Sequence, residues 1–275
     1  MPDPRRSGAH TGGGNRFRQI DADLDLDLAL ALRLADAADA ITTARFRADD
    51  LRVETKPDLT PVTESDREVE ETLRERIGAE RPGDAVLGEE YGATGGGDRR
   101  WLLDPIDATK NFVRGVPVWA TLIALERSGS VDVGVVSAPA LGRRWWAARG
   151  GGAFANGDRI AVSDVRVLAD AHVGYDDIPA FEDHGMGEQF LDLARRCWRT
   201  RGFGDFWQHV LVAEGALDAA LEPSVAPWDI AALIVILEEA GGCLTDLSGS
   251  ARIDGGSVVT SNGLVLDAVL EAVGR

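Results

Sequence analysis

The segment that most constrains the fold of this chain lies at residues 101–115 and reads WLLDPIDATKNFVRG. It begins with the apolar residues of a buried strand and ends with the pattern of a helix. Pro105 lacks a backbone N–H donor and has a fixed φ angle, so we expect the strand to stop there. Asp104 and Asp107 can then turn to one side of the chain. The segment predicts a strand, a turn that carries two carboxylates, and a helix directly after it.

Apolar runs separated by turn residues surround this segment. After it, VWATLIALE, VDVGVVSAP and RRWWAARG predict an antiparallel meander, and GGGAFANGDR adds an Asn-Gly turn. Before it, residues 21–47 predict a helix because of their length and their content of Ala and Leu. A second helix follows Thr63, which can cap it, and Asp66 stands close to a capping-box position.

The second half alternates strands with helices, from HVGYDD to LVLDAVLEAVG, which predicts an α/β lobe. We therefore expect an α+β protein in three parts. Residues 1–19, rich in Gly, Arg and Pro, predict a disordered tail. Residues 20–160 form an N-terminal α+β lobe with an antiparallel-rich sheet, and residues 161–275 form a C-terminal α/β lobe.

The net charge of −17 argues against several classes of function. A surface this acidic repels nucleic-acid phosphates and anionic lipids, so no nucleic-acid or membrane partner is expected. The sequence has no apolar signal segment at its start and no run of about 18 apolar residues, so we expect a cytoplasmic protein. Cys197 and Cys243 lie in apolar stretches and predict reduced thiols. An enzyme this acidic needs metal ions to hold an anionic substrate.

Five acids stand at the ends of apolar runs: Asp66, Glu89, Asp104, Asp107 and Asp229. Taken singly, each fits a helix cap. If the five converge, their repulsion is costly unless cations neutralise them. Hard oxygen ligands without nearby His or Cys favour Mg²⁺, with Mn²⁺ or Ca²⁺ as alternatives.

The helix that begins near Ala108 and Thr109 adds a second element to this site. Its first N–H groups have no helical acceptor and favour a phosphate. The Ile106 carbonyl offers a further oxygen between the two aspartates. A metal site beside a helix N-terminus indicates phosphoryl chemistry.

The segments DPIDATKNF, GEE, DLTPVTESD and PWDIAALIVILEEAGG resemble the signature segments of the inositol monophosphatase superfamily, and the resemblance runs from about residue 21 to 275. It implies a layered αβαβα sandwich, phosphomonoesterase activity that depends on Mg²⁺ and is inhibited by Li⁺, and a homodimer. Within the superfamily, FVRGVPVWATLIAL and GVVSAPALGRRWWAARG look most like actinobacterial histidinol-phosphate phosphatases, which act in histidine biosynthesis. The resemblance thus implies hydrolysis of histidinol phosphate, with inositol or sugar phosphates as the alternative.

The resemblance also implies a set of metal ligands. Glu89 and Asp104, with the Ile106 carbonyl, would bind the first Mg²⁺. Asp104 would be shared with a second Mg²⁺, completed by Asp107 and Asp229, and two or three ions would bind in all, with Mn²⁺ as an alternative. Most ligands then belong to the N-terminal lobe, while Asp229 and the substrate pocket belong to the C-terminal lobe.

Catalytic roles follow from the same resemblance. Thr109, linked to Asp66, would orient and activate the attacking water, and Glu89 would help to order it. The backbone amides of Ala108 and Thr109 would hold the phosphate. A metal-activated water would attack in line, without a covalent phosphoenzyme.

One residue departs from the family pattern, in which glycine stands where this chain has Ala108. If the position needs φ > 0, alanine costs about 1 kcal/mol or more. If it needs only a small side chain, the methyl group crowds the phosphate. Alanine is harmless if it is simply the first helical residue. A catalytically weakened Mg²⁺-binding homologue is therefore an alternative to a working enzyme.

The resemblance also implies a leaving-group pocket at Asp205, Phe206 and Glu222. Two carboxylates suit a leaving group that carries a cation, such as an amino alcohol, better than a neutral polyol. Asp205 also fits a helix cap. Four tryptophans are candidates for stacking on an imidazole, or for the core or a subunit interface: Trp119, Trp145, Trp146 and Trp207. Three scattered histidines are interpreted as structural: His172, His184 and His209.

Overall fold

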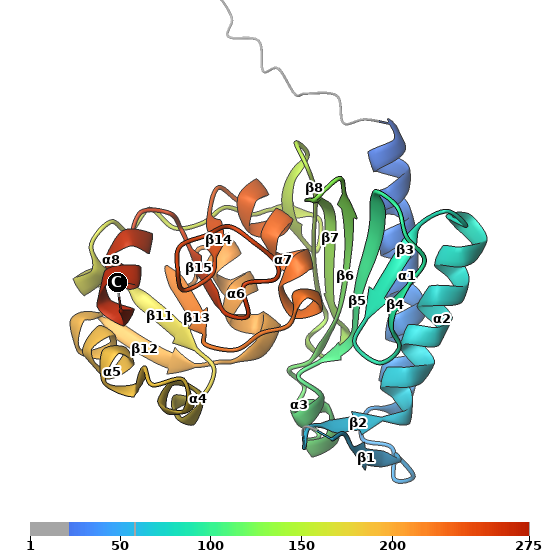
Figure 1. Ribbon diagram of the computed structural model, residues 1–275, viewed down its shortest axis with the longest axis horizontal. Helices are drawn as coiled ribbons and strands as arrows, with labels where there is room; N and C mark the ends of the chain where they lie inside the picture. The colour runs from blue at the N-terminus through green and yellow to red at the C-terminus, as the bar shows by residue number, and fades with distance from the viewer. Residues whose placement is uncertain (1–21, 58, 275) are drawn as a thin grey trace, which may run out of the picture.

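The computed structural model describes residues 22–57 and 59–274 of the chain. Two β-sheets alternate with three layers of helices, which confirms the αβαβα sandwich (Figure 1). The tail predicted for residues 1–19 lies outside the described residues.

The first sheet has eight strands, and every neighbouring pair is antiparallel except β3 and β5. In spatial order the strands are β10 (Asp158–Arg159), β9 (Gly152–Ala155), β8 (Arg143–Ala148), β7 (Ser130–Ala138), β6 (Ala120–Arg127), β5 (Arg99–Asp107), β3 (Ala85–Gly88) and β4 (Gly92–Thr94). Strands β6, β7 and β8 are the predicted meander. The predicted Asn-Gly turn joins β9 to β10 and has positive φ at both residues, as such turns require.

Two long helices, α1 (Ala22–Arg45) and α2 (Glu64–Glu80), cover the outer face of this sheet (Figure 1). Both were predicted. The capping box at the start of α2 is confirmed, because the Thr63 side chain accepts the backbone N–H of Asp66 and the Asp66 carboxylate accepts that of Thr63. A small hairpin of β1 (Val53–Thr55) and β2 (Pro61–Thr63), which was not predicted, precedes α2.

The second sheet is mixed and confirms the alternation of strands and helices. Its strands in spatial order are β12 (Arg199–Gly202), β11 (His172–Tyr175), β13 (Ala219–Glu222), β15 (Val258–Ser261) and β14 (Cys243–Thr245). The first three are parallel, so their carboxyl ends meet at one edge. In open sheets of this kind, ligands bind beyond the carboxyl ends of parallel strands.

The remaining helices fill the middle layer and the second outer layer. Between the sheets lie α6 (Asp205–Ala213) and α7 (Pro227–Glu239), whose buried faces form one apolar core with the first sheet. The outer layer holds α4 (Ile178–Asp183), α5 (Gly187–Arg196) and α8 (Leu266–Val273). Short helical pieces are α3 (Thr109–Arg114), η1 (Pro139–Leu141) and η2 (Leu168–Asp170).

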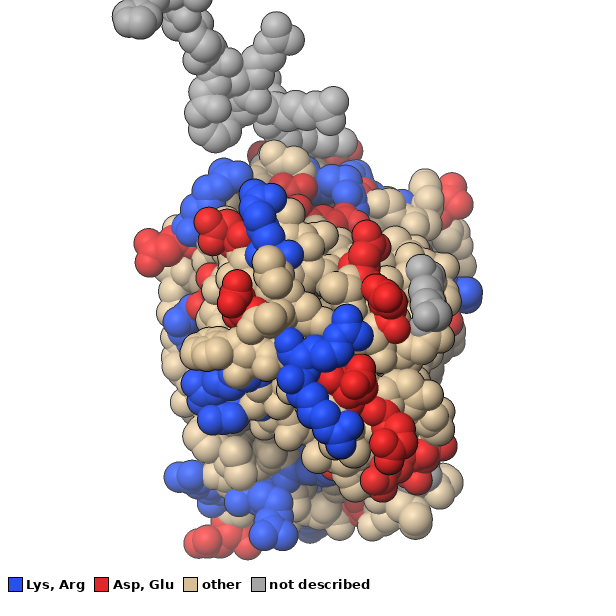
Figure 2. Space-filling model, turned by 90° about the vertical axis from the view of Figure 1, so that its left-hand side faces the viewer, with Lys and Arg blue, Asp and Glu red and all other residues tan. Residues whose placement is uncertain are grey.

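Two observations bear on the expected partners. In the part of the chain that the structure describes, no helix has the length and apolar character to cross a membrane. On the face of the second lobe, acidic and basic side chains are interspersed (Figure 2).

Candidate active site

Strand β5 does not stop at Pro105, so that prediction was wrong. The strand continues to Asp107 with an irregularity, since Asp104 lies opposite Leu122 and Asp107 opposite Ala120. Three steps on β5 thus match two steps on β6, which is the signature of a β-bulge. In a regular strand, residues three apart point to opposite faces, and one extra residue brings both aspartates to the same face. The bulge therefore places both carboxylates on one side of the chain, as the predicted turn would have done.

Asp104, Asp107 and Asp229 line one cavity of about 820 Å³. Burial, followed by repulsion from Glu89 and the other two aspartates, raises the pKa of Asp104 well above its usual range. Burial, followed by repulsion from Asp205 and Asp229, does the same to the pKa of Asp107. Burial raises the pKa of Asp229 to about 7, against the lowering effect of the Ala226 N–H that its Oδ2 accepts. Of the five acids predicted to converge, these three and Glu89 line the one cavity, whereas Asp66 is not among its lining residues.

The structure distinguishes between the alternatives for Ala108. Its φ angle is +65° and its ψ angle +45°, so it has the left-handed conformation at the N-terminus of α3. This conformation costs alanine roughly 1–2 kcal/mol, whereas glycine adopts it freely. The residue is nearly buried and packs in a small apolar cluster with Phe112 and Trp119. The left-handed backbone conformation therefore explains why the family pattern has glycine at this position.

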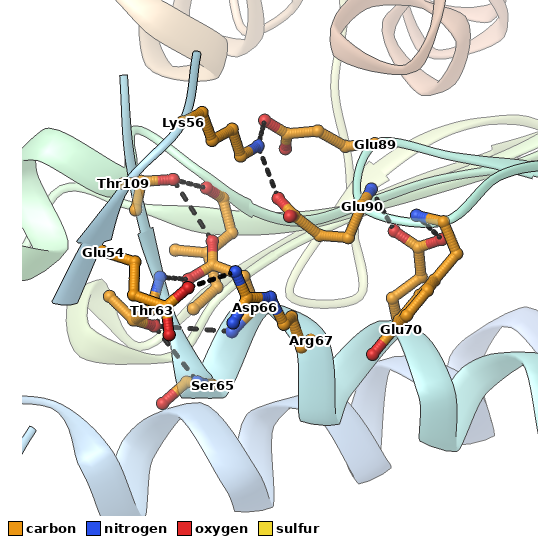
Figure 3. Close-up of polar contacts among 12 residues, drawn as sticks. Glu54, Lys56, Thr63, Ser65, Asp66, Arg67, Glu70, Glu89, Glu90 and Thr109 are labelled. Atoms are coloured by element: carbon orange, nitrogen blue, oxygen red, sulfur yellow. Dashed lines mark hydrogen bonds and ion pairs between the residues drawn. The ribbon is translucent and has the colours of Figure 1, made fainter. Parts of the chain in front are cut away.

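Asp66 and Thr109 are in contact, as predicted. The Thr109 hydroxyl lies 3.2 Å from Asp66 Oδ1 and 2.8 Å from the Ile106 carbonyl oxygen. Asp66 is fully buried, and its Oδ2 accepts the Thr63 N–H at 2.8 Å. Burial is the main reason that the pKa of Asp66 is raised to about 6. The capping box of α2 thus fixes the carboxylate that Thr109 meets (Figure 3).

Glu89 contacts a lysine that the sequence reasoning missed. Lys56, at the end of β1, places Nζ 2.7 Å from Glu89 Oε1 and 2.6 Å from Glu90 Oε1 (Figure 3). Burial lowers the pKa of Lys56, but the two glutamates outweigh it and the net shift is upward. Glu89 lies on the same cavity as the three aspartates. No sequence pattern pointed to Lys56, because the hairpin that carries it was not predicted.

A fully buried glutamate holds the Gly-Glu-Glu turn in place. Glu70 of α2 accepts the backbone N–H groups of Glu90 at 2.7 Å and Tyr91 at 3.2 Å. The Glu70 carboxylate occupies the space beside Gly88, where a Cβ atom would lie 2.1 Å from its Oε1. Glycine is therefore required directly before Glu89, and the turn is supported from inside the protein (Figure 3).

These residues fit a divalent metal, by two observations. Asp104 Oδ1 is buried without a hydrogen-bond partner, which is costly unless a cation meets it. The carboxylates also raise one another's pKa values, which a cation between them would reverse. Within residues 22–57 and 59–274, no three acidic, His or Cys side chains already converge on one point as ligands.

The predicted substrate residues line the same cavity. Asp205 and Phe206 begin α6, and Glu222 ends β13. Phe206 also connects these residues to the aspartates of β5, because its backbone N–H donates to Asp107 Oδ2 at 2.7 Å. The helix-cap alternative for Asp205 was wrong, since Gly204 is the N-cap and no side chain caps the helix.

A third carboxylate, Asp176, lies on this wall and was missed. It directly follows β11, as Glu222 ends the neighbouring β13. Partial burial, followed by repulsion from Glu222 and Asp177, raises the pKa of Asp176 to about 6. Burial, followed by repulsion from Glu222 and Asp176, raises the pKa of Asp205 to about 8. The signal available in the sequence was an acid at the end of a strand in the α/β half.

The structure decides between the alternatives for the tryptophans and adds a contact for one histidine. Trp119 and Trp145 are buried in the core, as one alternative had it. None of the four named tryptophans lines the cavity, whereas Trp228 and Phe203 do. His209 was assigned only a structural role, but it lies at the cavity and contacts Glu222, with Nε2 3.0 Å from Oε1.

Comparison with known proteins decides the family. A model of the inositol monophosphatase family matches residues 23–273. The chain belongs to the inositol monophosphatase family. It is 56% identical over 243 residues to a histidinol-phosphatase of Mycobacterium tuberculosis, covering 86% of this chain and 94% of that protein. A histidinol-phosphatase of Streptomyces coelicolor is 51% identical, with 86% and 92% covered. An inositol-1-monophosphatase of Mesorhizobium japonicum is 36% identical, with 77% and 82% covered.

Solved structures of the family have the same fold. An IMPase from Thermotoga maritima superposes with a TM-score of 0.80 at 34% identity, covering 90% of this chain and 96% of the other. The extragenic suppressor protein suhB from Bartonella henselae gives a TM-score of 0.84 at 27% identity, covering 91% and 99%. The family fold that the sequence motifs implied is therefore confirmed.

Proposed function

We propose that the chain hydrolyses histidinol phosphate to histidinol and phosphate, in a Mg²⁺-dependent reaction that serves histidine biosynthesis. The observation that carries this proposal is the group of three carboxylates, Asp176, Asp205 and Glu222, which lines the same cavity as the aspartates of β5. The two relatives named histidinol-phosphatases, at 51% and 56% identity, support it.

The carboxylate wall favours a cationic leaving group. After burial, repulsion from Glu222 contributes to the raised pKa values of both Asp205, about 8, and Asp176, about 6. An ammonium group between them offsets that repulsion, whereas a neutral polyol leaves it in place. Histidinol carries such an ammonium group, and its imidazole can stack on Phe203 or Trp228, which line the cavity.

Phosphate would be held at the start of α3. Ala108 in the left-handed region followed by helical Thr109 turns successive backbone N–H groups toward one side, as in anion-binding nests. Both residues line the cavity. We propose that these N–H groups bind the phosphoryl oxygens of the substrate.

Asp104, Asp107, Asp229 and Glu89, with the Ile106 carbonyl, would hold two or three Mg²⁺ ions, with Mn²⁺ as a substitute and Li⁺ as an inhibitor. When bound, these ions neutralise the carboxylates, polarise the phosphoryl group and lower the pKa of water.

Asp66 and Thr109 would prepare the attacking water. The Thr109 hydroxyl has one proton, which it can donate to the Ile106 carbonyl at 2.8 Å or to Asp66 Oδ1 at 3.2 Å. When a metal ion occupies the Ile106 oxygen, the proton would go to Asp66, and a lone pair of Thr109 Oγ could then accept a hydrogen from water. The raised pKa of Asp66, about 6, suits a group that takes up a proton near neutral pH. As the family resemblance implies, we also propose that the protein works as a homodimer in the cytoplasm.

Isosteric substitutions test the leaving-group assignment. A charge-assisted hydrogen bond to a buried carboxylate is worth roughly 1.5–3 kcal/mol, so Asp205→Asn and Glu222→Gln should each lower kcat/KM for histidinol phosphate by about 10- to 100-fold. Inositol 1-phosphate hydrolysis should change much less. Asp177→Asn, an equal change of charge at the exposed rim of the same cavity, serves as the control. Equal losses on both substrates would show that the carboxylates only support the fold.

Inositol 1-phosphate is the second candidate substrate, because a relative named inositol-1-monophosphatase is 36% identical over most of this chain. If the wild-type protein hydrolyses this neutral substrate faster than histidinol phosphate, an inositol-phosphate phosphatase would be the better assignment.

A further inference from the structure

We propose that His209 is a positioning residue for substrate specificity: it holds one oxygen of Glu222 so that the other oxygen faces the cationic leaving group. This inference deepens the proposed function and rests on its assignment of the cavity. His209 would not touch the reacting atoms and would act only through Glu222.

Two donors from one helix converge on a single carboxylate oxygen. Gln208 Nε2 and His209 Nε2, adjacent residues of α6, both donate to Glu222 Oε1. All three side chains are buried, since the residues are 0%, 2% and 8% exposed. No described residue donates a hydrogen bond to Oε2 of Glu222, and this glutamate lines the cavity. One oxygen is thus anchored in the protein and the other is left for a ligand.

The hydrogen bonds also determine the protonation of the imidazole ring. An ionised carboxylate only accepts hydrogen bonds, so His209 Nε2 must carry a hydrogen. On the other side of the ring, Nδ1 lies 2.9 Å from Thr260 Oγ1, which lies a longer 3.4 Å from the Ala220 carbonyl. The threonine hydroxyl therefore donates to Nδ1, and a neutral ring suffices for the whole chain of contacts.

The anchored glutamate differs from its neighbours on the cavity wall. Among the described residues, none donates a side-chain hydrogen bond to Asp176 or Asp205. Glu222 alone of the three carboxylates has an orientation fixed by buried partners, which come from α6 and, through the ring, from β15. A carboxylate with a fixed orientation discriminates between ligands by geometry, because only a ligand whose cationic group reaches that position can form the contact.

Binding of histidinol, the amino-alcohol product, tests this role independently of turnover. In calorimetry with Mg²⁺ and phosphate present, His209→Leu should weaken histidinol binding roughly 10-fold, as expected for losing a well-oriented charge-assisted contact. Binding of inositol should change less than about twofold. His209→Gln, which keeps an amide donor near the position of Nε2, should restore most of the affinity, and Thr260→Val should give an intermediate loss.

A double-mutant cycle separates positioning from a merely structural role. If His209 acts through Glu222, His209→Leu adds no further loss in a Glu222→Gln background. Additive losses, or equal losses for histidinol and inositol, would overturn the proposal. Should His209→Leu unfold, Thr260→Val provides the same comparison, with a smaller loss that should also vanish in the Glu222→Gln background. If the wild type binds histidinol selectively but releases no phosphate from histidinol phosphate, the proposed function fails while this inference stands. If the wild type does not prefer histidinol to inositol, the inference is wrong.

Discussion

Asp205→Asn should stabilise the metal-free protein while it weakens substrate discrimination. Asp205 has a left-handed backbone, with φ of +50°, which asparagine tolerates as well as aspartate. The substitution therefore removes a charge and changes little else. The charge is unfavourable where it stands, because burial and the neighbouring Glu222 and Asp176 carboxylates raise the pKa of Asp205 to about 8.

The size and pH dependence of the gain follow from this pKa. The pKa of this carboxyl is higher in the folded protein than in the unfolded chain, where it is 3.8. The free energy of unfolding is therefore highest below pH 3.8, where both states are protonated, and falls as the pH rises from there through about 8. At about 1.4 kcal/mol per pH unit, the penalty in the wild type has an upper bound of about 6 kcal/mol. Solvent in the open cavity and side-chain movement reduce it, and we expect about 2 kcal/mol. For a chain of this size that corresponds to a rise in Tm of about 4–8 °C.

Thermal unfolding in EDTA at pH 8 and pH 4.5 measures this effect. Asp205→Asn should unfold at a higher temperature than the wild type at pH 8 and at nearly the same temperature at pH 4.5. Asp49→Asn, which removes an exposed carboxylate after α1, is the matched control and should shift stability by less than about 0.5 kcal/mol at either pH. No gain at pH 8, or an equal gain at both pH values, would refute the reasoning.

Three further variants test other parts of the site. Asp107→Asn keeps an oxygen for the Phe206 N–H, so the fold should persist, but phosphate release and the rise of Tm on adding Mg²⁺ should both disappear; a retained Mg²⁺ effect in thermal unfolding would contradict the ligand assignment. Ala108→Gly should raise kcat or leave it unchanged, because strain relief of roughly 1–2 kcal/mol is offset in part by about 0.8 kcal/mol of lost methyl burial, and a clear loss of rate in steady-state kinetics would show that alanine is tuned to the site. Gly204→Ala should lower the free energy of unfolding in urea by about 1 kcal/mol or more, because its φ is +70° and the new Cβ would lie 2.8 Å from Asp176 Oδ1. A variant as stable as the wild type would show that neither the backbone angle nor the close approach matters.

The sequence was informative where local chemistry determines structure. Apolar runs between turns identified the meander of β6, β7 and β8, and the Thr63 and Asp66 pair identified the start of α2. Four of the five acids singled out in the sequence line one cavity: Glu89, Asp104, Asp107 and Asp229.

What could not be predicted depends on partners distant in the sequence. The bulge after Asp104 becomes visible only in the register with β6. The sequence alone therefore predicted that the strand ends at Pro105. Lys56 meets Glu89 across 33 positions of the chain, on a hairpin too short to leave a clear pattern. His209 resembles any core histidine until the side chain of Glu222, on another strand, is placed beside it.

The most direct test of the account is phosphate release by the wild-type protein from histidinol phosphate and from inositol 1-phosphate, each with Mg²⁺ and with excess EDTA. The account predicts a kcat/KM for histidinol phosphate at least roughly 10-fold higher, as one charge-assisted contact alone would give, and no release in EDTA. Equal or faster hydrolysis of inositol 1-phosphate would contradict the role of the carboxylate wall, and release that persists in EDTA would contradict the metal site.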